Sequence, residues 1–491
     1  MSPFRCLSLA CVLSCAAHVA AAPPRLPPEV VAALKRAEIP TSAMSVLVQE
    51  VGESGGASAP RLAWQASEPV NTASLMKLVT TYAALDLLGP TWNWQTPVWL
   101  QGALQQPQGV LEGSLIIKGS GDPTLVLERT WLLLRRVQQQ GVHEIRGDIV
   151  LDRSAFTASG QSESAFDGEP LRAYNAQPDA LLLNYKSILL NFVPEPTRGK
   201  ARITAEPKLA GVSIDTSAPL VSGPCDDWRA ALKIDTDDPA RIRFLGNYPA
   251  RCGEKLWILA YADPHGYNAR LIEALWRELG GRLTGRVRDG VAPSTPPRFV
   301  FDSVPLAQVV RDINKFSNNV MAQQLFLTLG LQVVGEGTRE AARQVVKRWL
   351  RSRLGDGNAA AAVVDNGSGL SRDSRLSARL LGDLLRHAWA SPVMPELMSS
   401  LPIYGLDGTL RNSTATAVAG RAHIKTGSLR DVNAMAGYVL SRSGQRYVLV
   451  AVVNHPSAQS ARPALEALLQ WTVQDGTASA RNANKPATTK N

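Results

Sequence analysis

The sequence predicts a mixed α/β fold in which β-rich segments interrupt a parent domain built of helices layered on a sheet. Alternating apolar residues at 44–50 and 61–66 precede a helix-like run at 74–88, and this order is typical of the start of a layered domain. Short strand-like runs separated by turns fill residues 99–297. Helical runs return from residue 304, and three more strand-like runs follow at 422–453.

At 491 residues the chain is long enough for two or three domains. We expect a discontinuous parent domain at 23–98 and 298–475, an inserted domain at 99–183 and 264–297, and a second inserted domain nested within it at 184–263. Residues 476–491 lack apolar periodicity and are predicted to be disordered. Helices are expected at 28–37, 74–88, 125–140, 268–279, 306–314, 320–329, 338–353, 377–389 and 463–473. Strands are expected at 44–50, 61–66, 114–118, 148–152, 181–192, 201–205, 242–245, 255–261, 422–427, 433–440 and 446–453.

The first 22 residues have the pattern of a cleaved export signal. Arg5 is followed by an apolar run over 7–19 and by three alanines at 20–22, which matches the charged, apolar and small-residue regions of such signals. The apolar run is too short to span a bilayer. A buried core helix and a lipoprotein signal at Cys15 are the weaker alternatives. We therefore expect an exported, soluble chain in the periplasm.

Two cysteines, Cys225 and Cys252, remain after loss of the signal, and 27 positions separate them. An oxidising compartment favours one structural disulfide between them, and the alternative is a pair of buried thiols. The six histidines are scattered, with no metal-ligand spacing. No metal or other cofactor is predicted.

The formal net charge is +10, and loss of Arg5 leaves +9. A positive surface outside the cytoplasm suits peripheral association with an anionic wall polymer or lipid headgroups, although solubility alone explains it equally well. No basic block is interleaved with aromatic residues, so nucleic acid is not an expected partner. The oligomeric state stays open.

Ser74 and Lys77 begin the predicted helix at 74–88, which Gly89 and Pro90 end. Residues three apart share one face of a helix, so the lysine amine can take the serine proton if its pKa is lowered. Ser-x-x-Lys occurs by chance roughly twice in a chain of this length. An N-terminal helix cap with a solvated lysine is therefore the simpler interpretation of this motif alone.

Two distant motifs change that interpretation. Ser317-x-Asn319 falls in a predicted loop, and Lys425-Thr426-Gly427 falls on a predicted strand. Lys-Thr-Gly is expected by chance in only about one chain in twenty. Ser-x-x-Lys, Ser-x-Asn and Lys-Thr-Gly in this order are the signature of serine enzymes that form acyl-enzymes with β-lactams.

Each motif meets a need of acyl transfer. Ser74 supplies the nucleophile and Lys77 the base, and the Ser317 hydroxyl can relay a proton to the leaving amine. The Asn319 amide can hold a peptide carbonyl, while Lys425 and Thr426 can capture a terminal carboxylate. The backbone N–H groups of Ser74 and Ser428 are the expected oxyanion-hole donors, and Gly427 allows substrate close to the strand. Taken singly, Ser317 and Asn319 could be helix caps and Lys425 an edge-strand charge.

With these motifs the chain resembles the class C low-molecular-mass penicillin-binding proteins, the D-alanyl-D-alanine carboxypeptidase/endopeptidase family. The likeness extends to residues 118–123, 365–372 and 401–410, and the separation of 243 positions from Ser74 to Ser317 suits a large insert. It implies a β-lactamase/transpeptidase-like domain, an antiparallel sheet flanked by helices, with two inserted β-rich domains. It also implies removal of the terminal D-Ala from peptidoglycan stem peptides, with endopeptidase activity as a second outcome, and covalent acylation by β-lactam antibiotics.

The resemblance further implies an acidic residue in the insert that binds the amino end of the stem peptide's diamino acid. Asp152 is the candidate, although it could equally be a residue of a surface turn. Two alternatives to the carboxypeptidase are a β-lactamase, which needs a second base to hydrolyse its acyl-enzyme, and a non-catalytic wall-binding scaffold. The sequence leaves open the balance of carboxypeptidase and endopeptidase activity and the type of stem peptide.

Overall fold

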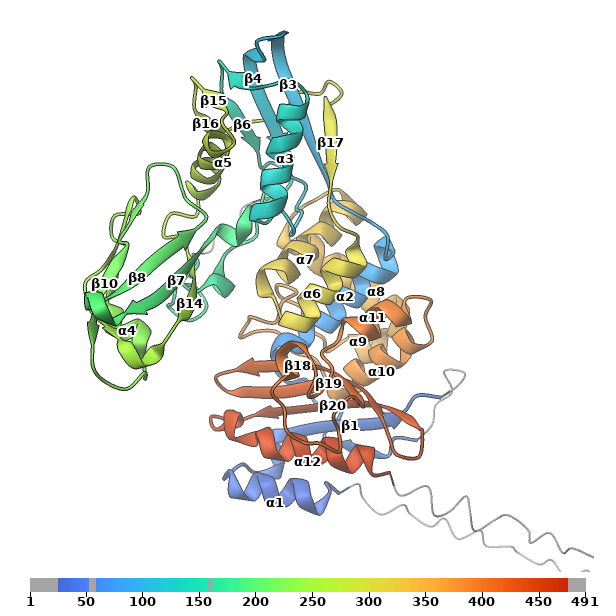
Figure 1. Ribbon diagram of the computed structural model, residues 1–491. Helices are drawn as coiled ribbons and strands as arrows, with labels where there is room; N and C mark the ends of the chain where they lie inside the picture. The colour runs from blue at the N-terminus through green and yellow to red at the C-terminus, as the bar shows by residue number, and fades with distance from the viewer. Residues whose placement is uncertain (1–24, 53–58, 158–159, 161, 476–491) are drawn as a thin grey trace, which may run out of the picture.

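The computed structural model describes residues 25–52, 59–157, 160 and 162–475. The predicted signal at 1–22 and the predicted tail at 476–491 lie outside these residues. Figure 1 shows the parent domain at the bottom of the view and the inserted segments rising from it and folding down to one side.

The parent domain is built on one antiparallel sheet of five strands in the order β18-β19-β20-β1-β2. The first strand of the chain therefore pairs with the last, and Met44 lies opposite Val453. All seven residues from 447 to 453 are buried, because helices cover both faces of the sheet. The strands are β1 (Met44–Glu50), β2 (Leu62–Trp64), β18 (Ala422–Leu429), β19 (Val432–Leu440) and β20 (Arg446–Asn454).

Two helical layers enclose this sheet (Figure 1). Side chains alternate across a strand, and on β1 Val46 and Val48 face one layer while Leu47 faces the other. The smaller layer contains α1 (Pro28–Arg36) and α12 (Arg462–Val473). The larger layer contains α2 (Met76–Leu88), α6 (Leu306–Phe316), α7 (Asn319–Val334), α8 (Arg339–Leu354), α9 (Asp356–Ala359), α10 (Ala378–Trp389) and α11 (Met394–Ser400).

Between α2 and α6 the chain forms a second, mixed sheet that is covered by two helices. Its strands follow the order β15-β5-β4-β3-β17, with β6 paired to β4 and β16 paired to β6. The strands are β3 (Gln95–Gln105), β4 (Val110–Lys118), β5 (Glu144–Ile145), β6 (Ile149–Asp152), β15 (Arg282–Leu283), β16 (Val287–Asp289) and β17 (Phe299–Asp302). The helices are α3 (Leu127–Gln139) and α5 (Tyr267–Glu278).

A third unit is nested within this segment and contains two small sheets around α4 (Trp228–Leu232). A disulfide joins Cys225 to Cys252 in this unit. One sheet has the order β13-β10-β8-β7-β14 and the other β11-β12-β9. The strands are β7 (Ser187–Glu195), β8 (Lys200–Glu206), β9 (Ser213–Ile214), β10 (Ser217–Val221), β11 (Ile234–Asp235), β12 (Arg241–Phe244), β13 (Tyr248–Pro249) and β14 (Lys255–Ala260).

Parts of the insert differ from the expectations drawn from the sequence. The strand expected at 181–192 begins only at Ser187, because Asn184, Tyr185 and Lys186 adopt positive φ angles that interrupt extended backbone. The eleven-residue strand β3 was not predicted, since its Pro97 and Gly102 are residues that weaken a strand pattern. The predicted domain boundaries remain a proposal.

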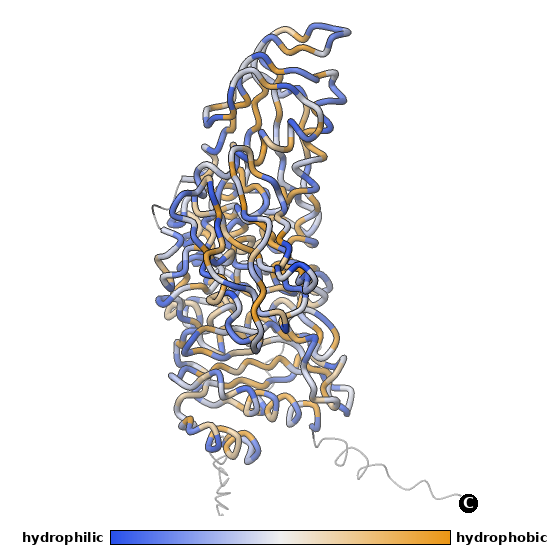
Figure 2. The backbone as a smooth tube through the Cα atoms, turned by 60° about the vertical axis from the view of Figure 1, so that its left-hand side comes forward, coloured by the Kyte–Doolittle hydropathy of each residue, from blue (hydrophilic) through white to orange (hydrophobic). Residues whose placement is uncertain are grey.

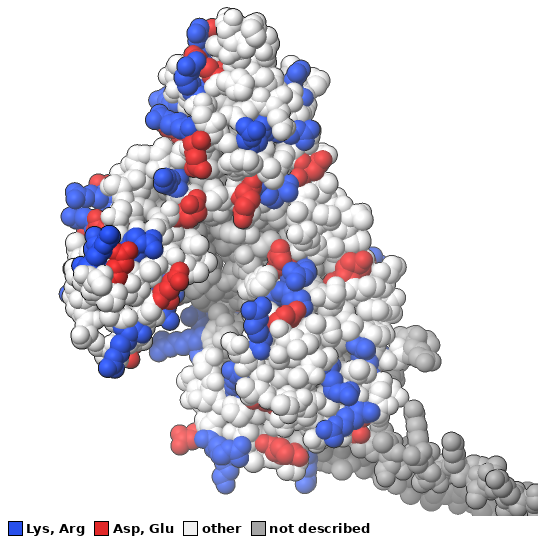
Figure 3. Space-filling model, in the orientation of Figure 1, with Lys and Arg blue, Asp and Glu red and all other residues white. Residues whose placement is uncertain are grey.

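Apolar residues recur along the strands of the parent sheet (Figure 2). None of the helices in the described part of the chain combines the length and the apolar character needed to cross a bilayer. The surface is hollowed between the nested unit and the parent domain (Figure 3).

Candidate active site

The first motif lies where the helical layer meets the sheet. A short 3-10 turn (Ala73–Leu75) precedes α2 and contains Ser74. Ala73 has a φ of 47°, a left-handed conformation that is costly for a residue with a Cβ and that tends to occur at functional sites. The Lys77 side chain follows one turn later and is fully buried.

The Lys77 amine contacts three acceptors. Its Nζ lies 3.0 Å from Ser74 Oγ, 2.6 Å from Asn319 Oδ1 and 2.6 Å from the Ser368 carbonyl oxygen. Burial, assisted by the nearby Lys425 charge, holds the pKa of Lys77 well below its ordinary value. In the neutral amine, two N–H groups can bond Asn319 and Ser368, so the lone pair is left for the Ser74 hydroxyl proton.

The middle motif forms the corner between α6 and α7. Ser317 ends α6 with a φ of 55°, and Asn318 caps α7 by accepting a hydrogen bond from Met321 N at 3.1 Å. Ser317 and Asn319, on either side of the cap, therefore both reach the site. The Ser317 hydroxyl accepts a hydrogen bond from Lys425 rather than from Lys77.

The third motif lies on β18, the edge strand of the sheet. Lys425 Nζ lies 2.8 Å from Ser317 Oγ and 2.7 Å from the Thr426 carbonyl oxygen. Burial lowers the pKa of Lys425 to about 7. The Thr426 hydroxyl lies 3.1 Å from that of Thr409, and the Ser428 hydroxyl donates to Gln459 Oε1 at 3.2 Å.

Two glycines let the backbone around Ser74 pack closely. A Cβ at Gly427 would lie 2.6 Å from the Thr72 carbonyl oxygen, and one at Gly369 would lie 2.0 Å from that of Ala73. Either contact would push β18 or the 365–370 loop away from the Ser74 N–H. The glycines therefore hold the strand and the loop against the nucleophile.

These groups open onto a cavity of about 750 Å³. Parent-domain residues of all three motifs line it, and the insert supplies Phe166, Asp167 and Tyr174. The Arg372 guanidinium lies 4.8 Å from the centre of the Phe166 ring, so the insert contacts the parent domain at the rim. The lining residues are Ser74, Phe166, Asp167, Tyr174, Phe316, Ser317, Asn319, Leu370, Arg372, Thr409, Thr426, Ser428, Leu429 and Arg430.

Asp152, the candidate for diamino-acid binding, is not one of the residues that line this cavity. It is fully buried at the end of β6, where its carboxylate accepts hydrogen bonds from Ser154 N and Ala292 N at 2.9 and 2.8 Å. The acidic residue that reaches the cavity is Asp167. Burial opposes its ionisation, but hydrogen bonds from Tyr174 and Asn175 leave the pKa of Asp167 lowered.

Sequence reasoning missed several groups of the site. The Ser368 carbonyl contacts Lys77 through the backbone, so no residue type marks it. Asn366 shapes this loop, since its Oδ1 accepts hydrogen bonds from the N–H groups of Ser368 and Gly369. Asp and Asn followed by glycines are a usable signal for such a turn. Within the residues described, no group of three or more His, Cys, Asp or Glu side chains could hold a metal ion.

The fold and the three motifs define a serine enzyme of the penicillin-binding class. More specifically, the chain belongs to the D-Ala-D-Ala carboxypeptidase 3 (S13) family, whose model matches residues 28–474. The predicted family and the predicted activity, that of a serine-type carboxypeptidase, are therefore confirmed.

Similar proteins agree with this assignment. The D-alanyl-D-alanine carboxypeptidase of Actinomadura sp. (strain R39) is 29% identical over 409 residues, which cover 79% of this chain and 74% of the relative. The D-alanyl-D-alanine carboxypeptidase DacB of Haemophilus influenzae is 24% identical over 402 residues, which cover 78% of this chain and 80% of the relative.

A crystal structure of penicillin binding protein 4 from Haemophilus influenzae superposes with a TM-score of 0.72 at 21% identity, over 90% of this chain and 99% of that one. This likeness confirms the predicted fold class. The same protein has also been solved in complex with a β-lactam.

Proposed function

We propose that the chain removes the terminal D-Ala from peptidoglycan stem peptides through an acyl-enzyme on Ser74. The observation that carries this proposal is the buried amine of Lys77, which lies 3.0 Å from Ser74 Oγ. As Oγ attacks the carbonyl carbon of the penultimate D-Ala, neutral Lys77 accepts the Ser74 proton. The C–N bond then breaks, and the leaving D-Ala amine takes the proton that Lys77 accepted, relayed through the Ser317 hydroxyl, so Lys77 is neutral again. Water, giving a proton to Lys77, attacks the ester carbonyl, and that proton passes to Ser74 Oγ as the ester bond breaks.

The other motif residues hold the substrate in this scheme. Asn319 Oδ1 accepts from Lys77, so the Nδ2 group is the one available to donate to a peptide carbonyl. Lys425 and Thr426 bind the terminal carboxylate at the sheet edge. The N–H groups of Ser74 and Ser428 stabilise the oxyanion, and Gly427 leaves room beside them.

Asp167 replaces Asp152 in the proposed recognition of the diamino acid. Its carboxylate is exposed at the cavity and carries a lowered pKa, so it is charged at neutral pH and suited to a side-chain ammonium. Exchange of Asp167 for Asn is expected to raise KM about tenfold for stem peptides with a free side-chain amine. Peptides acetylated at that amine should show no change, and Asp373→Asn, at another exposed carboxylate, is the matched control.

Release of D-Ala from a synthetic stem peptide tests the proposed nucleophile. Ser74→Ala should abolish release, while Ser352→Ala, at an exposed serine of α8, should retain it. Intact-protein mass spectrometry with benzylpenicillin should show one added penicilloyl group in the wild type and none in Ser74→Ala. A full adduct on Ser74→Ala would refute the assignment.

Cleavage of cross-links uses the same chemistry with a different leaving amine. We propose endopeptidase activity as a second activity of the same site, because the cavity of about 750 Å³ extends from Ser74 to the insert and has room for a branched peptide. Mass spectrometry of products from defined monomeric and cross-linked muropeptides measures the balance of the two activities.

The β-lactamase alternative requires a carboxylate that activates water beside Ser74. Among the described residues that line the cavity, Asp167 is the carboxylate, and it comes from the insert. We therefore expect a long-lived penicilloyl adduct and slow turnover of a chromogenic cephalosporin.

A non-catalytic scaffold is the other alternative to an enzyme. A scaffold would keep its cellular role in Ser74→Ala, whereas an enzyme would lose it.

We propose export to the periplasm through residues 1–22, which N-terminal sequencing of the mature chain tests.

A further inference from the structure

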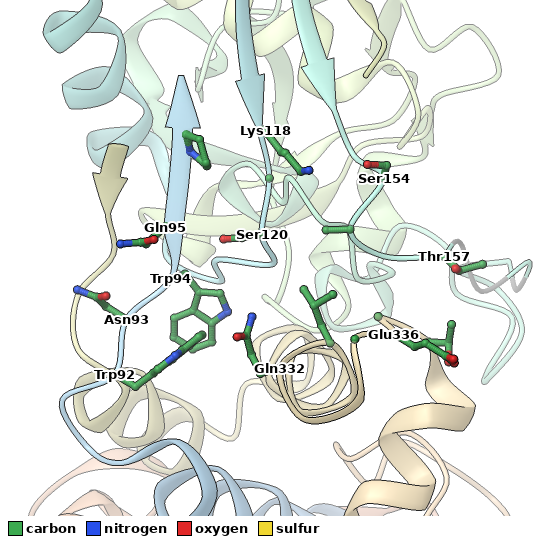
Figure 4. Close-up of a pocket in the computed structure, with 17 residues that line it drawn as sticks. Trp92, Asn93, Trp94, Gln95, Lys118, Ser120, Ser154, Thr157, Gln332 and Glu336 are labelled. Atoms are coloured by element: carbon green, nitrogen blue, oxygen red, sulfur yellow. The ribbon is translucent and has the colours of Figure 1, made fainter. Parts of the chain in front are cut away.

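A second cavity, of about 1000 Å³, lies where the insert joins the parent domain. We call it the junction cavity. It shares no lining residue with the cavity at Ser74. Figure 4 shows its walls, which come from the segment entering β3, the ends of β4 and β6, and the turn between α7 and α8. Its polar or aromatic lining includes Trp92, Asn93, Gln95, Lys118, Ser120 and Gln332.

The walls of the junction cavity are held in place by hydrogen bonds. Trp94 Nε1 donates to Thr328 Oγ1 at 3.0 Å, and Trp94 itself is almost fully buried. On the opposite wall, Thr157 N donates to the Gly337 carbonyl oxygen at 3.1 Å. A preformed cavity binds a ligand with little cost of ordering the protein.

Several polar groups in the cavity have unused hydrogen-bonding capacity. In the described part of the chain, the buried Ser120 hydroxyl has no hydrogen-bond partner. The side-chain amides of Asn93, Gln95 and Gln332 lie around the same space (Figure 4). Each of these amides offers both donors and acceptors to a ligand in the cavity.

Lys118 supplies a cation to this cavity. Its Nζ lies 4.0 Å from the Asp152 carboxylate, which already accepts two backbone N–H groups. Because the Lys118 side chain is 42% exposed, its ammonium can bind a further anion. The charged lining residues are Lys118 and, on the wall beside Thr157, the exposed Glu336 (Figure 4). Donors and acceptors in this number, one partly exposed indole at Trp92 and a single charge of each sign fit a carbohydrate better than a lipid or a polyanion. Sugar rings pack their C–H faces on indoles.

We propose that the junction cavity binds a short glycan of N-acetylated amino sugars that carries a carboxylate. Trp92 packs against a sugar face, the amides bind hydroxyl and acetamido groups, and Lys118 binds the carboxylate. Such a site binds the sugar strand of the wall polymer while the separate catalytic cavity binds a stem peptide. Binding of the glycan to the junction cavity does not depend on the roles given to Ser74 or Lys77.

Calorimetric titration of the full chain with two tetrasaccharides tests the proposal. One is a peptide-free glycan fragment of peptidoglycan, which carries lactyl carboxylates, and the other is uncharged tetra-N-acetylchitotetraose. The wild type should bind the anionic fragment saturably and about tenfold more tightly than the neutral one. Lys118→Gln should remove this preference, and Gln332→Ala should weaken both ligands severalfold. Lys347→Gln, at an exposed lysine on α8, should match the wild type.

Two results would overturn the glycan site. One is the absence of saturable binding of either sugar. The other is wild-type affinity for both sugars in both Lys118→Gln and Gln332→Ala. Equal affinity of the wild type for the two sugars would refute the role of Lys118. Ser74→Ala separates this proposal from the catalytic one, because it should lose D-Ala release and keep its affinity for the glycan.

Discussion

The charge on Lys425 leads to a prediction about pH. Burial lowers the pKa of Lys425 to about 7, so its ammonium is present below pH 7 and is lost above it. If this cation holds the terminal carboxylate of the substrate, raising the pH weakens capture of that substrate. For a pKa of about 7, the charged fraction falls from about nine-tenths at pH 6 to about one-hundredth at pH 9.

The assay compares two stem peptides that differ only in their last group, a carboxylate or a carboxamide. Lys77 must be neutral to act as a base, and its lowered pKa makes its contribution rise with pH for both peptides. The ratio of the two kcat/KM values removes that shared effect. We expect this ratio to fall about a hundredfold between pH 6 and pH 9. A ratio that stays constant over this range would refute the role of Lys425 in carboxylate binding.

Three further predictions concern the same fold. Lys425→Met should abolish carboxypeptidase activity yet raise Tm by a few degrees, because it removes a buried amine whose partners among the described residues are a hydroxyl and a carbonyl, not a carboxylate. A lower Tm in thermal unfolding would contradict this. Gly427→Ala should lower kcat by about a hundredfold or more, since the new Cβ would lie 2.6 Å from the Thr72 carbonyl oxygen and displace an oxyanion donor. Steady-state kinetics of D-Ala release measure kcat, and an unchanged kcat would contradict the close packing of β18 on Thr72. Replacing Cys225 and Cys252 by serine should lower the free energy of unfolding of the nested unit by about 3 kcal/mol, with kcat unchanged, as denaturant unfolding and kinetics can check.

The local geometry of the first and third motifs could be predicted because each is set by its own segment of the sequence. Ser74 and Lys77 share a face whenever their segment is helical. Side chains alternate along a strand, so Lys425 and Gly427 share one face, and the structure packs Lys425 against Ser317 and Gly427 beside Ser74. The handedness of the corner at Ser317 could not be predicted, because a positive φ at a serine depends on the packing of α6 against α7.

Groups that act through the backbone or from the insert were beyond sequence reasoning. The Ser368 carbonyl reaches Lys77 only because the 365–370 loop packs on α2. Asp152 and Asp167 have the same side chain and lie 15 positions apart. What distinguishes them is whether the fold buries the carboxylate under backbone donors or exposes it at the cavity.

One wall of the catalytic cavity belongs to the insert, through Phe166, Asp167 and Tyr174. On the proposed role of Asp167, the residues that form the acyl-enzyme and the residue that selects the stem peptide come from separate segments of the chain. Mutations in the insert would then change the preference among stem peptides and leave the acylation chemistry intact. A chimera that exchanges this segment between relatives would carry the preference of the donor.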